Sequence, residues 1–143
     1  MYKMLLLEDD PLCSSEINRL LINFCNLHIT SSPSIALHLA TANKYNLIMI
    51  NINKKSGMTV INIAQSISNL SNCGETPIVA YTILKSESNK EYLLSYGFTH
   101  FISEPFNTRN FAQHIKFILS SQINNNESQD KSLKMQSAPK LVY

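Results

Sequence analysis

Five short apolar runs alternate with longer amphipathic segments along this chain. The runs occupy residues 3–7, 27–30, 46–52, 77–82 and 100–103. Runs of this length and apolar character are typical of strands that are covered on both faces. A single amphipathic segment separates each run from the next. The pattern therefore predicts five strands joined by helices.

The intervening segments have the three-and-four spacing of amphipathic helices. Asp10 and Pro11 form an N-cap and first-turn pair, and Ser32-Pro33 repeats that signal before the second helix. The fourth helix is expected over residues 86–96, with Gly97 ending it, and Asn107 or Thr108 is expected to cap the fifth. The inward stripes expected for helices one, two, three and five are Ile17, Leu20, Leu21 and Phe24; Ile35, Ala36, Leu39 and Ala40; Val60, Ile61, Ala64 and Ile67; and Phe111, Ile115, Ile118 and Leu119.

Strands separated by single helices pair in parallel through right-handed crossovers. The sequence therefore predicts an α/β fold with a doubly wound five-stranded parallel sheet, ordered 2-1-3-4-5, in a flavodoxin-like three-layer sandwich. We expect one domain over residues 1–122. Residues 123–143 are too polar to pack and are predicted to form a disordered tail. Alternatively, the tail is a short docking segment, closed by Leu141-Val142-Tyr143, that becomes ordered on a partner.

Composition narrows the function without deciding it. The chain has 143 residues, 44% of them hydrophobic, and a net charge of +2, which is too weak to argue for nucleic acid or an anionic membrane. No apolar stretch approaches the roughly 20 residues of a membrane span, and the N-terminus lacks the form of a signal peptide. The cysteines, Cys13, Cys25 and Cys73, are odd in number and lack metal spacing. With Cys13 and Cys25 placed at the two ends of the first helix, we expect three reduced thiols and a cytoplasmic protein.

Polar side chains follow the predicted strands at the positions where each strand ends. Glu8 and Asp9 follow the first run, Asn51 ends the third, Thr82 ends the fourth, and Glu104 follows the fifth. In an open parallel sheet these ends meet at one edge and build a site there. No nucleophile has a visible base, and the three glycines form no phosphate-binding loop. We therefore expect that the protein is not an enzyme.

These segments resemble the receiver domains of two-component response regulators over about residues 2–122. The matching motifs are Met4-Leu5-Leu6-Leu7-Glu8-Asp9-Asp10-Pro11-Leu12, residues 45–51, residues 77–82, and Gly97 with Phe101-Ile102-Ser103-Glu104-Pro105-Phe106. The resemblance implies that Glu8 and Asp9 stand where that family binds a divalent cation, usually magnesium. It also implies that Thr82 and Phe101 stand at the family's two switch positions.

Two departures from the family pattern indicate a degenerate receiver. Asn51 stands where the family has the aspartate that accepts a phosphoryl group from a histidine kinase, and a neutral amide cannot attack phosphorus. Glu104 stands where the family has a lysine, and it would repel a phosphoryl group. Lys54 and Lys55 replace an apolar-proline pair and could form an ion pair with Glu104. We expect no required cofactor and, at most, weak magnesium binding by Glu8 and Asp9.

The sequence thus favours a phosphorylation-independent signalling adaptor that acts through protein contacts. One rival is a receiver that binds a cation or a phosphoryl-like anion non-covalently and switches conformation. A second is a transcription regulator that acts through its tail, although a tail net charge of +1 is poor support for DNA binding. A third is a small α/β enzyme of unrelated chemistry. The family's usual surface, formed by helix four, strand five and helix five, would bind the partner or a second copy of the chain. Its expected residues are Lys90, Tyr92, His100, Phe101, Phe106, Asn107 and Arg109.

Overall fold

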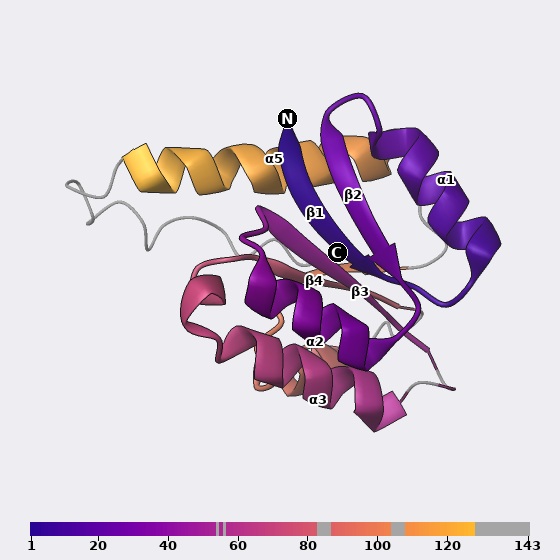
Figure 1. The fold of residues 1–143 in the computed structure, drawn as a ribbon, viewed down its shortest axis with the longest axis vertical. Coiled ribbons are helices and arrows are strands. Elements are labelled where there is room, and N and C mark those ends of the chain that lie inside the picture. Colours follow the sequence, from indigo (N-terminus) through magenta and orange to yellow (C-terminus); the bar gives the residue numbers. More distant parts are fainter. Residues whose placement is uncertain (54, 56, 83–86, 104–107, 128–143) are drawn as a thin grey trace.

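The protein is a single five-stranded parallel sheet between two layers of helices (Figure 1). The computed structural model describes residues 1–53, 55, 57–82, 87–103 and 108–127. The strand order is β2-β1-β3-β4-β5, as predicted. The strands are β1 (Tyr2–Leu7), β2 (Cys25–Thr30), β3 (Leu47–Ile52), β4 (Ile78–Thr82) and β5 (His100–Ser103).

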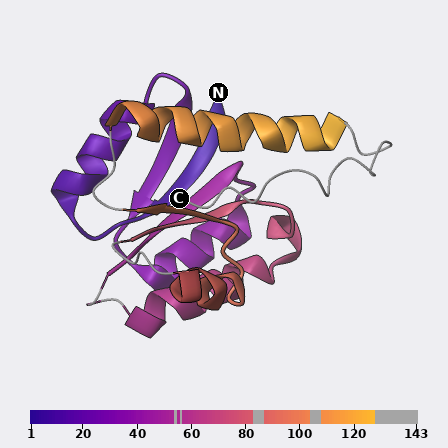
Figure 2. The ribbon, with the colours of Figure 1, turned by 180° about the vertical axis from the view of Figure 1, so that it is seen from behind.

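The helices are divided between the two faces of the sheet. Helices α1 and α5 cover one face, and α2, α3 and α4 cover the other, as the front and back views show together (Figures 1 and 2). A separate apolar core lies under each layer, because alternate residues of each strand point to opposite faces. The helices are α1 (Pro11–Leu21), α2 (Pro33–Ala42), α3 (Gly57–Ser68), α4 (Glu87–Leu94) and α5 (Thr108–Glu127), with a short 3-10 turn, η1 (Ser71–Cys73), after α3.

The predicted helix signals act as their chemistry requires. The Asp10 side chain accepts the Leu12 amide at 3.0 Å, and the Ser32 hydroxyl accepts the Ile35 amide at 3.2 Å. Each cap satisfies an amide that the first turn would otherwise leave without a partner. Beyond the end of α4, Gly97 has a φ of 97°, in the region that favours glycine.

Four details differ from the sequence-based expectations. Ile35 is 51% exposed rather than inward, because apolar residues surround α2 and its fully buried positions are Ala36 and Ala40, with Leu37 and Leu39 partly buried against the same core. The first helix ends at Leu21, so Phe24 lies in the turn beyond it. Cys25 is the first residue of β2 and not a helix end. Helix α5 continues to Glu127, past the expected boundary at residue 122. Within the described residues, no helix is long and apolar enough to cross a membrane.

Candidate functional site

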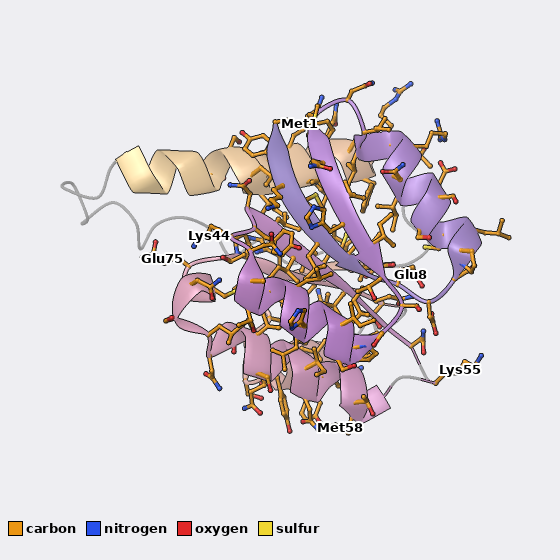
Figure 3. All side chains as sticks on the ribbon, in the orientation of Figure 1. Met1, Glu8, Lys44, Lys55, Met58 and Glu75 are labelled. Carbon is orange, nitrogen blue, oxygen red and sulfur yellow. The ribbon has the colours of Figure 1, made fainter. Side chains whose placement is uncertain are left out.

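Strand register brings three polar side chains together at the carboxyl ends of the central strands. Leu7 of β1 pairs with Ile50 of β3, so Glu8 and Asn51, one residue further along each strand, lie side by side. Asn51 pairs in turn with Tyr81 of β4. The three side chains therefore project from the same face, the one that α1 and α5 cover. Figure 3 shows Glu8 at this edge of the sheet, with Lys44 and Glu75 at the opposite edge.

The Glu8 carboxylate is buried and fully hydrogen-bonded. Its residue is 3% exposed. Asn51 Nδ2 donates to both of its oxygens, at 2.9 Å to Oε1 and 3.0 Å to Oε2. The Asp10 amide donates to Oε2 at 2.9 Å, and the Tyr81 hydroxyl donates to Oε1. The Cys13 thiol makes a weaker hydrogen bond to the same carboxylate. A carboxylate has about four lone-pair sites, so these contacts leave none of them open.

The same contacts decide the charge of the pair. Burial acts to raise the pKa of the Glu8 carboxyl, but the hydrogen bonds from Tyr81, the Asp10 amide and Asn51 outweigh it, so the pKa lies below its ordinary value of 4.5. Burial, followed by the hydrogen bond to Glu8, raises the pKa of Tyr81 well above its ordinary value. Glu8 is therefore ionised and Tyr81 protonated at neutral pH, which gives a charge-assisted hydrogen bond.

Three further groups surround this cluster. The Cys13 thiol lies 3.9 Å from the Tyr81 hydroxyl. Asp9 is exposed, and Asn53 Nδ2 lies 3.5 Å from its Oδ1. Asn51 Oδ1 is buried, and it has no hydrogen-bond partner among the residues that the structure describes. The Asn51 side chain thus makes its two hydrogen bonds to Glu8 through Nδ2, and its Oδ1 accepts none within the described residues.

A cleft of about 290 Å³ opens beside the cluster. It lies between the ends of β1 and β3, where the strand order reverses, which is the usual ligand position in open α/β sheets. Exposed Lys55, which is labelled in Figure 3, is one of its lining residues. The cleft is lined by Leu7, Glu8, Asp9, Ser31, Pro33, Asn51, Asn53, Lys55, Thr59 and Val60.

The predicted switch residues are buried at neighbouring strands. Thr82 ends β4, 3% exposed, and pairs with Ile52 of β3 and Ser103 of β5. Phe101 is buried in the core under α2, α3 and α4. Glu104 and Lys54 lie outside the described residues, so the expected ion pair across the cleft stays a prediction.

The predicted partner surface is only partly a common face. Tyr92 is 45% exposed, but its hydroxyl donates to Met58 Sδ at 3.0 Å and its ring centroid lies 5.1 Å from that of Tyr96. Its hydroxyl is therefore directed toward the start of α3. Arg109 is exposed, and Lys90 and His100 are partly buried. Phe101 was expected on this surface but is buried in the core, so that part of the prediction is wrong. Phe106 and Asn107 lie outside the described residues.

The donor set of this cluster does not fit a divalent cation. Magnesium needs free oxygen lone pairs in a near-octahedral arrangement, whereas both Glu8 oxygens already accept hydrogen bonds from the protein. Asn51 presents its amide nitrogen and not its oxygen to the acid. In the described ranges, no three His, Cys, Asp or Glu residues are grouped so that they could hold a metal ion.

Tyr81 is the site residue that the sequence reasoning missed. Its hydroxyl reaches the acid only because β4 is in register with β3 at Asn51. The available signal was parity: in a parallel sheet, residues in register across neighbouring strands share a face. Tyr81 stands immediately before Thr82, and this shift of one residue places it beside Asn51.

Comparison with solved structures identifies the fold. The chemotaxis response regulator CheY4 of Vibrio cholerae matches with a TM-score of 0.76 and 20% identity, over 82% of this chain and 98% of that chain. A CheY-like receiver domain protein from Methanospirillum hungatei JF-1 gives 0.75 and 21%, over 87% and 98%. The receiver domain of a Pseudomonas aeruginosa PAO1 sensor histidine kinase, with a magnesium ion coordinated in its active site cleft, gives 0.70 and 18%, over 83% and 98%. At these identities the likeness shows the CheY-like fold. No family model matches the sequence, and no curated protein matches it.

Proposed function

We propose that this chain is an atypical response-regulator receiver domain that acts as a phosphorylation-independent signalling adaptor through protein–protein contacts. The receiver domains that share its fold support a signalling role. The observation that carries the proposal is the contact of Asn51 with Glu8 at 2.9 and 3.0 Å. The group at the end of β3 is a neutral amide engaged as a donor, so no carboxylate nucleophile faces the cleft from that position.

The first experiment tests the loss of phosphoryl chemistry. The protein is incubated with acetyl phosphate and magnesium, and its intact mass is measured, with a phosphorylation-competent receiver in the same buffer as the positive control. We expect the mass to stay unchanged because Asn51 cannot form an acyl phosphate. A stoichiometric phosphoryl adduct on this chain would overturn the proposal.

The second experiment tests the contact surface. Tyrosine is a common anchor of protein interfaces, and Tyr92 offers a half-exposed ring at α4. Phe117 on α5 is 48% exposed, against 45% for Tyr92. It lies beside Tyr2 and Phe24, near the starts of β1 and β2, and therefore outside the part of α5 next to β5. Tyr92→Ala should weaken capture of the partner by about thirtyfold or more, as expected for an interface hot spot, whereas Phe117→Ala should not. Equal loss with both variants would contradict this surface.

Regulation of such an adaptor would come from partner binding, expression level or dimerisation through α4, β5 and α5. We place it in the cytoplasm because its three cysteines form no disulfide, which is typical of proteins in a reducing compartment. The proposal includes no catalytic activity, no membrane partner and no nucleic-acid partner. Sedimentation across a concentration series tests dimerisation, and the Tyr92→Ala variant shows whether the same surface is used.

A second candidate function is a receiver that binds a cation or a phosphoryl-like anion without covalent chemistry. The buried Asn51 Oδ1 favours it, because an acceptor without a donor would gain from an electropositive neighbour. The complete engagement of Glu8 opposes it. Calorimetry with magnesium and beryllofluoride separates the two functions: saturable heat supports the switch, and its absence supports the adaptor.

A further inference from the structure

We propose that the protein's own donors take the place of a cation in this cleft. The Asn51 amide and the Tyr81 hydroxyl hold Glu8 in one state, so an aspartate at position 51 would not by itself restore a cation site. The inference rests on the proposed function only in assigning no phosphoryl chemistry to the cleft. It is independent of the adaptor's partner.

Both oxygens of the Glu8 carboxylate already accept hydrogen bonds from the protein. Oε1 accepts from Tyr81 and Asn51, and Oε2 accepts from Asn51 and the Asp10 amide. A cation ligated by Glu8 must displace at least one of these donors. The Asp10 amide is the least free to leave, since it belongs to the N-cap residue of α1. The displaceable donors are therefore side chains, and of these Asn51 and Tyr81 lower the pKa of Glu8 more than the Cys13 thiol does.

The ionised Glu8 carboxylate determines which end of the Asn51 amide faces it. The opposite amide orientation would place Oδ1 against an ionised carboxylate, which is repulsive. The observed orientation leaves Oδ1 buried without a partner, and the two contacts to Glu8 offset that loss. Asn51 therefore cannot turn its oxygen toward a cation bound by Glu8 without giving up both contacts to the acid.

Tyr81 hinders cation binding by Glu8 independently of Asn51. Tyr81 is fully buried on β4, in register with Asn51 of β3. Its hydroxyl reaches Glu8 Oε1 from β4, whereas Glu8 follows β1 on the other side of β3. Burial and the hydrogen bond to Glu8 both raise its pKa, so it keeps its proton and stays a donor at any physiological pH. Replacing Asn51 by aspartate removes one block and leaves this one in place.

Magnesium affinity, measured by calorimetry, tests the inference in wild type, Asn51→Asp, Tyr81→Phe and the double variant. Wild type should give no saturable heat, and Asn51→Asp should bind weakly. The double variant should bind at least about tenfold more tightly than Asn51→Asp, because a hydrogen bond to a charged group no longer competes for Oε1. Tyr81→Phe alone should stay close to wild type, since Asn51 still covers both oxygens.

The matched control is Tyr45→Phe in the Asn51→Asp background. Tyr45 is also a buried tyrosine with a hydrogen-bonded hydroxyl, to His28 Nδ1 at 2.7 Å, but it lies near the opposite edge of the sheet. It should leave magnesium affinity within about twofold, as for distant independent sites. If Asn51→Asp binds as tightly as its combination with Tyr81→Phe, the inference is wrong, although the adaptor proposal stands.

A wild-type measurement keeps the inference testable if a variant fails to fold. The side-chain amide signals of Asn51 in a nitrogen-15 correlation spectrum should not move as magnesium is added to about 10 mM. This concentration exceeds the dissociation constants of about 1 mM or less that are typical of oxygen-ligand sites for divalent cations. A saturable shift of these signals would overturn the inference. A phosphoryl adduct in the mass experiment would instead overturn the proposed function, so the two failures are distinguishable.

Discussion

Replacing Asn51 by aspartate should destabilise the protein in a pH-dependent way. Asn51 Nδ2 lies 2.9 and 3.0 Å from the Glu8 oxygens, so the new carboxylate would stand about 3 Å from a buried one. At an effective dielectric constant of about 20, two like charges at about 3 Å repel by about 5.5 kcal/mol. Protonating one carboxyl at about pH 7 costs less, about 4 kcal/mol, because its usual pKa is about 4. The protonated route therefore limits the loss.

The loss should shrink as the pH falls. A carboxyl whose pKa is raised in the folded state contributes stability at low pH that disappears as the pH rises through the folded pKa. The free energy of unfolding, measured by urea titration in EDTA, should fall by about 4 kcal/mol at about pH 7 and by about 2 kcal/mol at about pH 5.5. Asn51→Ala is the control: it removes donors from a charged group, costs about 1.5–3 kcal/mol, and should do so equally at both pH values. A loss in Asn51→Asp that does not change between the two would refute the reasoning.

Three further predictions test other parts of the structure. Gly97→Ala should reduce the free energy of unfolding, measured by urea titration, by about 1–3 kcal/mol. The reason is that φ at Gly97 is 97° and that the new Cβ would lie 2.5 Å from the nearest side-chain atom. Gly74→Ala is the control: Gly74 has a φ of −58° and open space around its Cβ position, so this change should be neutral or slightly stabilising. Iodoacetamide followed by peptide mass mapping should modify Cys13 well before Cys25, because burial raises the pKa of the Cys25 thiol to about 12; equal rates would contradict this. The free energy of unfolding of wild type should decrease as the pH falls below 4.5, because the lowered pKa of Glu8 contributes stability that is complete above the unfolded-state pKa and is lost as the pH falls through the folded-state pKa. In acid urea titrations, the free energy of unfolding of Glu8→Gln should depend less steeply on pH. Parallel slopes would show that Glu8 does not carry the effect.

The sheet could be predicted because its sequence signal is local. Each central strand is a nearly unbroken apolar run, and single helices between the runs require parallel crossovers, which leaves few possible orders. The signal fails where apolar residues surround a helix. In α2, Ile35 was expected to be buried, but Ala36 and Ala40 lie against the sheet and Ile35 is exposed. Small residues allow closer approach of a helix to the sheet, and periodicity alone does not rank them above a large one.

Half of the site could be predicted in the same way. Glu8 and Asn51 end neighbouring strands, and the reversal of strand order brings them to one edge. What the sequence could not supply is which atoms meet. Asn51 turns its nitrogen and not its oxygen to the acid because Glu8 is ionised, and the reach of Tyr81 depends on the β3–β4 register. The polar stretch after residue 122 shows the limit at the chain end, because low apolar content argues against burial but not against a continued helix to Glu127.

The side chains around Glu8 also form a crosswise seam. Backbone ladder bonds stop at the strand ends, where sheets ordinarily fray, but here β1, β3 and β4 stay joined through Glu8, Asn51 and Tyr81. Opening any one of the three ends would expose a buried anion, so we expect them to open together. Their amide protons should then exchange with solvent deuterium as one cooperative unit, at rates nearer to those of the sheet centre than to those of a free edge.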